Sequence, residues 1–186
     1  MADNNNPKGP KYFKIEGLAA APDQQLIFGI REMGDKYDDF QYKITLLATH
    51  YEIDEKGLIK LEGDIRTIYE FNPYQQLYPK LKLPIALSSI EYDRFNKHLY
   101  LCTSFEHENE LGAYLWILNS TQLKKNIAPT LIKNEDGTPF EMQHKAEAVS
   151  IIDKNTILIV HDDDRKLIND RQPHQSAFQI LNINRR

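Results

Sequence analysis

Two glutamates stand at matching positions in two similar stretches of the sequence, and both could bind a cation. Glu16 precedes a Gly-Leu pair and Glu147 precedes an Ala-Val pair. Carboxylates suit Ca²⁺, which takes about six to eight oxygen ligands in proteins. With Asp162 as a third acidic ligand, these residues are candidates for a calcium site. The alternative is structural: Glu16 pairs with Arg31, and Glu147 accepts hydrogen bonds from loop amides.

A second group that could do chemistry begins at His161. His161 and Asp162 open the densest charge cluster of the chain, which continues through residues 163–165. A histidine changes its charge near neutral pH, so it can act in acid–base chemistry. His161 and Asp162 are therefore the candidates for catalytic residues. The alternative is a solvated loop that ends a strand.

The elements that must position these residues are three similar hairpins. They span about residues 15–31, 87–103 and 146–162, and the first and third align without a gap. In an antiparallel hairpin, the start of one strand lies beside the end of its partner. We therefore expect the polar residues at these strand ends to form one ligand face with the two glutamates: Arg31, Ser88, Ser89, Thr103 and Ser104.

The remaining sequence also predicts strands. Runs rich in Val, Ile, Tyr, Phe and Thr alternate with turn residues, which is typical of antiparallel sheets. We predict an all-β fold, namely a β-propeller of four-stranded antiparallel blades with about three blades present. A flexible leader covers residues 1–11 and the propeller covers 12–186, with blades at about 12–80, 81–140 and 141–186. The alternative is an antiparallel sandwich.

Three blades are too few for a closed ring, because propellers have about four to eight blades. The last predicted blade also lacks a strand. The sequence therefore predicts half of a six-bladed propeller. Its partner would be either a second copy, forming a homodimer, or an N-terminal half that precedes this chain.

Composition narrows the function classes. The 186 residues carry a net charge of −4, which argues against a nucleic-acid partner. The single cysteine, Cys102, is expected to be a buried thiol without a disulfide. No stretch predicts a signal peptide or a membrane span, so the chain as given is expected to be cytoplasmic, without a membrane partner.

Two segments resemble a known family. Residues 14–19 with 26–31 (KIEGLA and LIFGIR) and residues 144–149 with 157–162 (HKAEAV and ILIVHD) are similar to blades of an uncharacterised bacterial propeller family, labelled phytase-like or esterase-like. The resemblance implies a six-bladed fold and, from the wider group of calcium-dependent propellers, acidic ligands at the channel mouth. This sequence departs from the family pattern where Glu32-Met33-Gly34 replaces a Gly-Pro pair and where Ala148 replaces a glycine.

The sequence favours a propeller domain that binds a small molecule, a peptide or a cation at the channel mouth. One alternative is a metal-assisted hydrolase of the phytase-like or lactonase-like kind, acting on an ester or phosphoester. Another is a protein-interaction scaffold or a fragment without autonomous function. Whether the chain is an enzyme stays open at this level, as do its ligand and its native length.

Overall fold

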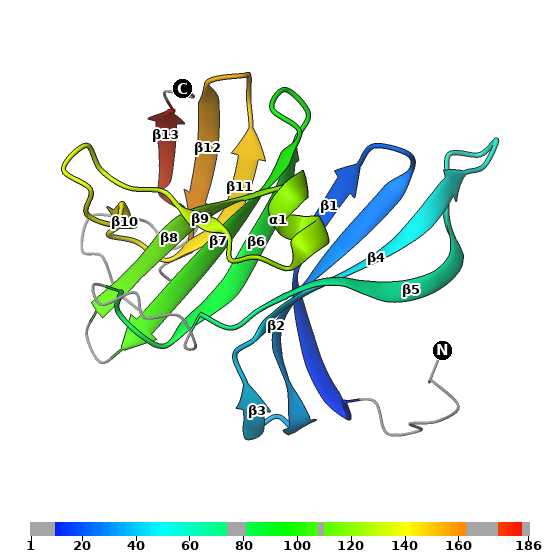
Figure 1. The fold of residues 1–186 in the computed structure, drawn as a ribbon, viewed down its shortest axis with the longest axis horizontal. Helices are drawn as coiled ribbons and strands as arrows, with labels where there is room; N and C mark the ends of the chain where they lie inside the picture. Colours follow the sequence, from blue (N-terminus) through cyan, green and yellow to red (C-terminus); the bar gives the residue numbers. More distant parts are fainter. Residues whose placement is uncertain (1–9, 74–80, 108–109, 163–174, 184–186) are drawn as a thin grey trace.

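The chain folds almost entirely into antiparallel strands, arranged in three sheets (Figure 1). The computed structural model describes residues 10–73, 81–107, 110–162 and 175–183. The all-β prediction is therefore confirmed, and none of the three sheets closes on itself. Residues 1–9 of the expected leader and residues 163–165 of the charge cluster lie outside the described residues.

The first sheet has the strand order β1-β2-β4-β5, so consecutive long strands are neighbours. These strands are β1 (Tyr12–Ala21), β2 (Gln25–Lys36), β4 (Ile44–Ile53) and β5 (Ile59–Phe71). A short strand, β3 (Asp39–Gln41), pairs with the far end of β2. The sequence predicted the long strands and missed β3, whose three residues carry no alternation.

The second sheet repeats this arrangement with β6 (Ile85–Asp93), β7 (His98–His107) and β8 (Glu110–Asn119). Two short strands, β9 (Thr130–Leu131) and β10 (Glu141–Met142), both pair with β8. Between β8 and β9 lies α1 (Ser120–Lys125), a helix that the sequence analysis missed. Asn119 and Gln122 form a capping box at its start, which satisfies amide groups that the first turn leaves free.

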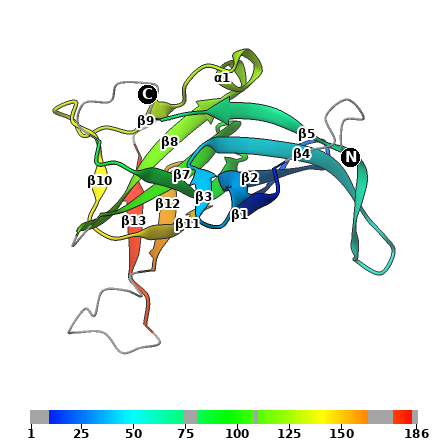
Figure 2. The ribbon, with the colours of Figure 1, turned by 90° about the horizontal axis from the view of Figure 1, so that it is seen from below.

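The third sheet has the order β11-β12-β13, with strands at Ala146–Ile151, Thr156–His161 and Phe178–Asn182. The first two of these strands form the hairpin predicted at about residues 146–162. Figure 2 shows the three sheets from below, with the second sheet between the other two.

The second sheet is buried on both faces, so two separate cores hold the molecule together. Leu99, Leu101 and Phe105 belong to a core shared with the first sheet, and Tyr100 and Cys102 to one shared with the third. Alternation along β7 sends successive side chains to opposite faces. Burial raises the pKa of the Cys102 thiol to about 12, as expected for a structural cysteine.

Trp116 lies at the centre of the first core. It is fully buried, and its indole Nε1 donates a hydrogen bond of 2.9 Å to the Thr103 hydroxyl. Its ring meets Phe71 of β5 edge to face, with the ring centroids 5.7 Å apart. The Trp side chain therefore joins the second sheet to the outermost long strand of the first.

The first strands of the three sheets lie side by side, because β6 packs against both β1 and β11. The contact with β1 depends on two glycines, Gly17 and Gly29, which are directly paired across β1 and β2. A Cβ atom at Gly29 would lie 2.5 Å from Leu87, and one at Gly17 would lie 2.9 Å from Ile90. These glycines let β6 approach the first sheet closely.

Each first strand also carries a β-bulge at the same position of its hairpin. The pairing with the second strand skips Glu16 in β1, Ser88 in β6 and Glu147 in β11. These are the residues that align in the sequence repeat. A bulge bends its strand and redirects the side chain of the extra residue. The three hairpins are therefore repeats in backbone detail as well as in sequence.

The close approach at Gly29 predicts a double-mutant effect. Gly29→Ala should lower the free energy of unfolding by about 1–3 kcal/mol, because the new methyl group overlaps Leu87. Leu87→Ala alone should cost about 2–5 kcal/mol through the cavity it creates. In the Leu87→Ala background, Gly29→Ala should cost far less than in the wild type. Urea unfolding of the four proteins measures this coupling; simple additivity of the two costs would contradict the proposed contact.

Candidate functional site

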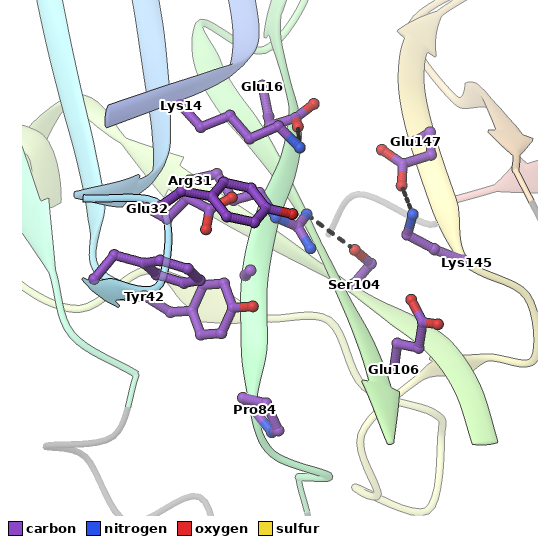
Figure 3. A pocket seen from close by; sticks show the side chains of 13 residues that line it. Lys14, Glu16, Arg31, Glu32, Tyr42, Pro84, Ser104, Glu106, Lys145 and Glu147 are labelled. Carbon is purple, nitrogen blue, oxygen red and sulfur yellow. Dashed lines mark hydrogen bonds and ion pairs between the residues drawn. The ribbon is translucent and has the colours of Figure 1, made fainter. Parts of the chain in front are cut away.

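A polar pocket of about 500 Å³ opens where the ends of the three sheets meet (Figure 3). It draws on β1 and β2 and the segment around β3, on β6 and β7, and on the start of the third sheet. Its lining combines seven charged residues with three aromatic rings, two small apolar residues and one hydroxyl: Lys14, Glu16, Arg31, Glu32, Tyr37, Phe40, Tyr42, Pro84, Ala86, Ser104, Glu106, Lys145 and Glu147.

Four of the residues predicted for the site line this pocket, namely Glu16, Arg31, Ser104 and Glu147. They come from three different sheets and are up to 131 positions apart in the printed sequence, between Glu16 and Glu147. The repeated bulges bring the two glutamates to the pocket, since each bulge lies where its first strand reaches the rim. The structure therefore brings these four residues together at one pocket.

Arg31 joins the first two sheets across the pocket. Its Nη1 donates to the backbone carbonyl of Leu87 at 3.1 Å and to the Ser104 hydroxyl at 3.4 Å. The guanidinium also lies over the ring of Tyr42, 5.9 Å from its centroid. These contacts fix the positive charge at the pocket wall. Arg31 does not form the ion pair with Glu16 that the structural alternative predicted.

The two glutamates each pair with the lysine two residues earlier in the sequence. Lys14 Nζ lies 2.5 Å from Glu16 Oε1, and Lys145 Nζ lies 2.6 Å from Glu147 Oε1. The hydrogen bond to Glu16 raises the pKa of Lys14 above its usual value. In Figure 3 the dashed lines mark these two pairs, on β1 and beside β11. Both carboxylates are therefore neutralised locally.

Glu32 is different, because Lys14 attracts its carboxylate electrostatically without forming an ion pair with it. The residue is only 6% exposed and lines the pocket. Among the residues that the structure describes, none forms a hydrogen bond or an ion pair with its side chain. A buried charge without a partner is costly, so such groups concentrate at binding sites. Glu32 is the strongest single indication of a ligand.

A cluster of aromatic rings stands beside Glu32. Tyr12 lies 6.0 Å from Tyr37 and 5.9 Å from Phe40, and Phe40 lies 5.2 Å from Tyr42, measured between ring centroids. Burial, followed by the charge of Glu32, raises the pKa of Tyr12. The turn from β2 to β3 brings three of these rings to the pocket, so the small strand missed by the sequence analysis has a role in building the site.

The other predicted ligand-face residues are structural. The Ser88 hydroxyl donates to the carbonyl of Cys102 at 3.3 Å, and the Ser89 hydroxyl accepts from the amide of Val149 at 3.2 Å. Thr103 is buried and accepts the indole hydrogen bond of Trp116. None of these three residues lines the pocket. Their hydroxyls satisfy buried groups within and between the sheets.

The candidate catalytic residues lie away from the pocket lining. His161 is buried, its Nε2 lies 3.1 Å from Gln179 Oε1, and its ring centroid lies 5.4 Å from that of His144. The Asp162 amide donates to the carbonyl of Lys145, and the Asp162 side chain is exposed. The structure thus places Glu16 and Glu147 at one pocket and does not bring Asp162 to its lining.

The described acidic side chains do not gather into a set of calcium ligands. Within residues 10–73, 81–107, 110–162 and 175–183, no three His, Cys, Asp or Glu side chains are close enough together to hold a metal ion. Glu16 and Glu147 would also have to release their lysines. These residues therefore do not fit a Ca²⁺ site as arranged, and we derive no step through a metal.

Sequence reasoning missed most of the pocket's other residues, including Glu32, Lys14 and Lys145. One signal was available, since Glu32 directly follows Arg31, which the sequence analysis placed on the ligand face. The aromatic residues gave no such signal, since tyrosine and phenylalanine are common throughout predicted strands.

Comparison with known proteins does not place the chain in a family. No family model, no curated protein and no solved structure matches the chain. In the described part of the chain, no helix has the length and apolar character needed to cross a membrane.

The lack of a direct ion pair to Glu32 among the described residues predicts only a small effect on stability. Glu32→Gln keeps the shape of the side chain and breaks no hydrogen bond or ion pair of the described residues, so the free energy of unfolding at pH 7 should stay within about 0.5 kcal/mol of the wild type. The matched variant Glu16→Gln removes a paired carboxylate and should lower it by up to about 1 kcal/mol. Urea unfolding compares them. If Glu32→Gln were the more destabilising of the two, Glu32 would have a partner within the folded chain.

Proposed function

We propose that this chain is a ligand-binding domain of β-propeller architecture whose pocket binds a small organic cation, such as a compound with a substituted ammonium group. The observation that carries the proposal is Glu32, a mostly buried residue that lines the pocket and whose carboxylate has no hydrogen bond or ion pair among the described residues. A ligand cation would supply such an ion pair.

The propeller architecture is supported by three features of the structure. The sheets are antiparallel meanders whose first strands lie side by side, and successive sheets pack face to face through two cores. The same bulge recurs in each first strand. Propellers place ligands at the mouth of the central channel that such first strands surround, and the pocket lies at the end of these strands.

The charge balance of the pocket favours a cationic ligand over an anionic one. Lys14 and Lys145 are paired with Glu16 and Glu147, and Arg31 is held by Leu87 and Ser104. Hydrogen bonds to a carbonyl and a hydroxyl leave the charge of Arg31 uncompensated, so the preference for a cation rests on the lining as a whole, which has four carboxylates against three cationic groups. An anion would have to compete with Glu16 and Glu147 for the lysines. A cation could form an ion pair with Glu32 without breaking an existing one.

The aromatic rings favour an organic cation over a metal ion. Tyr37 and Phe40 line the pocket near Glu32, while Tyr42 already stacks with Arg31. Ring faces attract alkylated ammonium groups by about 0.5–2 kcal/mol each and also shield their apolar carbon atoms. Calcium binding by Glu16, Glu147 and Asp162, and a hydrolase built on it, remain predictions from the sequence that no contact of the described residues favours.

The proposal predicts selective binding of a model cation. Choline should bind at millimolar concentration or tighter, whereas its neutral carbon analogue 3,3-dimethyl-1-butanol should bind at least about tenfold more weakly, since it lacks the charge that Glu32 requires. Titration monitored by NMR chemical shifts measures both. Glu32→Gln should weaken choline binding about tenfold or more, and Tyr37→Leu about two- to fivefold.

The control is Glu62→Gln, which removes a carboxylate that pairs with Lys60 on β5, outside the pocket lining. It should leave choline binding unchanged. A titration with CaCl₂ provides the opposing test. Equal binding of choline and its neutral analogue, or a calcium response that Glu16→Gln abolishes without any choline response, would contradict the organic-cation proposal.

A further inference from the structure

Both outer sheets expose an apolar face. On the first sheet, Leu18 is 58% exposed, and it pairs with Phe28, which pairs with Leu47 on β4. On the third sheet, Phe178 is 65% exposed and Ile180 is also exposed. Exposed apolar faces of this kind mark interaction surfaces on folded proteins. The two interfaces inside the chain show how faces of this kind are covered.

At the interface between the first two sheets, one row of side chains inserts and another receives. The inserting row is Ile90-Leu101-Trp116, three residues directly paired across β6, β7 and β8. The receiving row is Gly17-Gly29-Leu46, directly paired across β1, β2 and β4. Ile90 lies over Gly17, where a Cβ atom would be 2.9 Å away. All the side chains of both rows are buried.

The interface between the second and third sheets repeats this scheme. The inserting row is Val149-Ile159-Gln179, and the receiving row is Ser89-Cys102-Leu115. The Val149 amide donates to the Ser89 hydroxyl at 3.2 Å, so the two first strands meet at equivalent positions in both interfaces. In each interface, the residue after the bulge is small (Gly17 or Ser89), and a residue of the next sheet's first strand packs against it.

Each exposed face carries a row of this kind that has no partner row within the described residues. By position relative to the bulge, the inserting row of the first sheet is Leu18-Phe28-Leu47, and the receiving row of the third is Ala148-Val160-Phe178. Leu18 is 58% exposed, whereas its equivalents Ile90 and Val149 are 2% and 5% exposed. Ala148 supplies the small residue after the bulge and is exposed too.

We propose that a second copy of this chain covers both faces, with the inserting row of each copy on the receiving row of the other. The two copies would form a closed ring of six sheets related by a twofold axis. In this dimer the contacts between copies would repeat the two interfaces inside each chain. This pairing does not depend on which ligand the pocket binds.

Closure selects two copies. The exposed rows differ from each other, so the contact is head-to-tail, and head-to-tail contacts produce either a ring or an open polymer. Propeller rings contain about four to eight blades. One copy provides three sheets, two provide six, and three would exceed that range. In the dimer, each chain gains two sheet-on-sheet interfaces and leaves neither apolar face in water.

The first test is the mass of the protein in solution. Light scattering coupled to gel filtration should give twice the 21.7 kDa mass of the chain at micromolar concentration. Leu18→Glu and Phe178→Glu should each produce a monomer, because either change places a charge in both interfaces of the dimer. The control Phe95→Glu, at an exposed ring on the β6–β7 turn, should leave the dimer intact. Far-UV circular dichroism should confirm folded strands in each variant.

The second test identifies the pairing. The double variant Leu18→Cys and Ala148→Cys should form a covalent dimer on mild oxidation, since equivalent residues meet in both internal interfaces, while Leu18→Cys with Phe95→Cys should not. A monomeric wild type, an open polymer, a dimer that survives Phe178→Glu, or failure of the Leu18–Ala148 cross-link would each overturn the proposal.

Discussion

The structure depends on how closely the first strands of neighbouring sheets can approach. Gly17 and Gly29 form a flat surface without side chains, on which Leu87 and Ile90 lie. With larger residues there, β6 would have to move away from the first sheet and open the core that includes Trp116. The short distance between the two sheets thus depends on the absence of side chains at Gly17 and Gly29.

Close packing of the first strands also explains the site. Strands held this near to one another leave no room for long side chains between them, so the charged residues collect at the strand ends. The bulges at Glu16 and Glu147 direct carboxylates to that rim, and Arg31 ties the first sheet to the backbone of the second. Glu32 then lies beside aromatic rings, without a direct ion pair to any described residue. The pocket's polarity is therefore a consequence of the sheet packing.

The sequence could predict the features that repeat. Alternation and turn residues revealed the long strands, and the aligned hairpins located Glu16 and Glu147 on a common face, because period-2 patterns and hairpin geometry are local properties. It could not predict β3 or α1, which are short and depend on tertiary contacts or on a capping box at Asn119. Nor could it tell that Ser104 lines the pocket while Thr103 supports Trp116, because the packing of the sheets decides which of two adjacent strand residues faces the pocket.

The separation of the two cores has a consequence for how the molecule comes apart. The only tryptophan lies in the core between the first and second sheets, and the only cysteine in the core between the second and third. Indole fluorescence therefore senses the departure of the first sheet, whereas the reactivity of the thiol senses that of the third. The native chain thus carries one spectroscopic and one chemical reporter, each assigned to a single interface. Unlabelled protein can reveal whether its sheets separate together or in sequence.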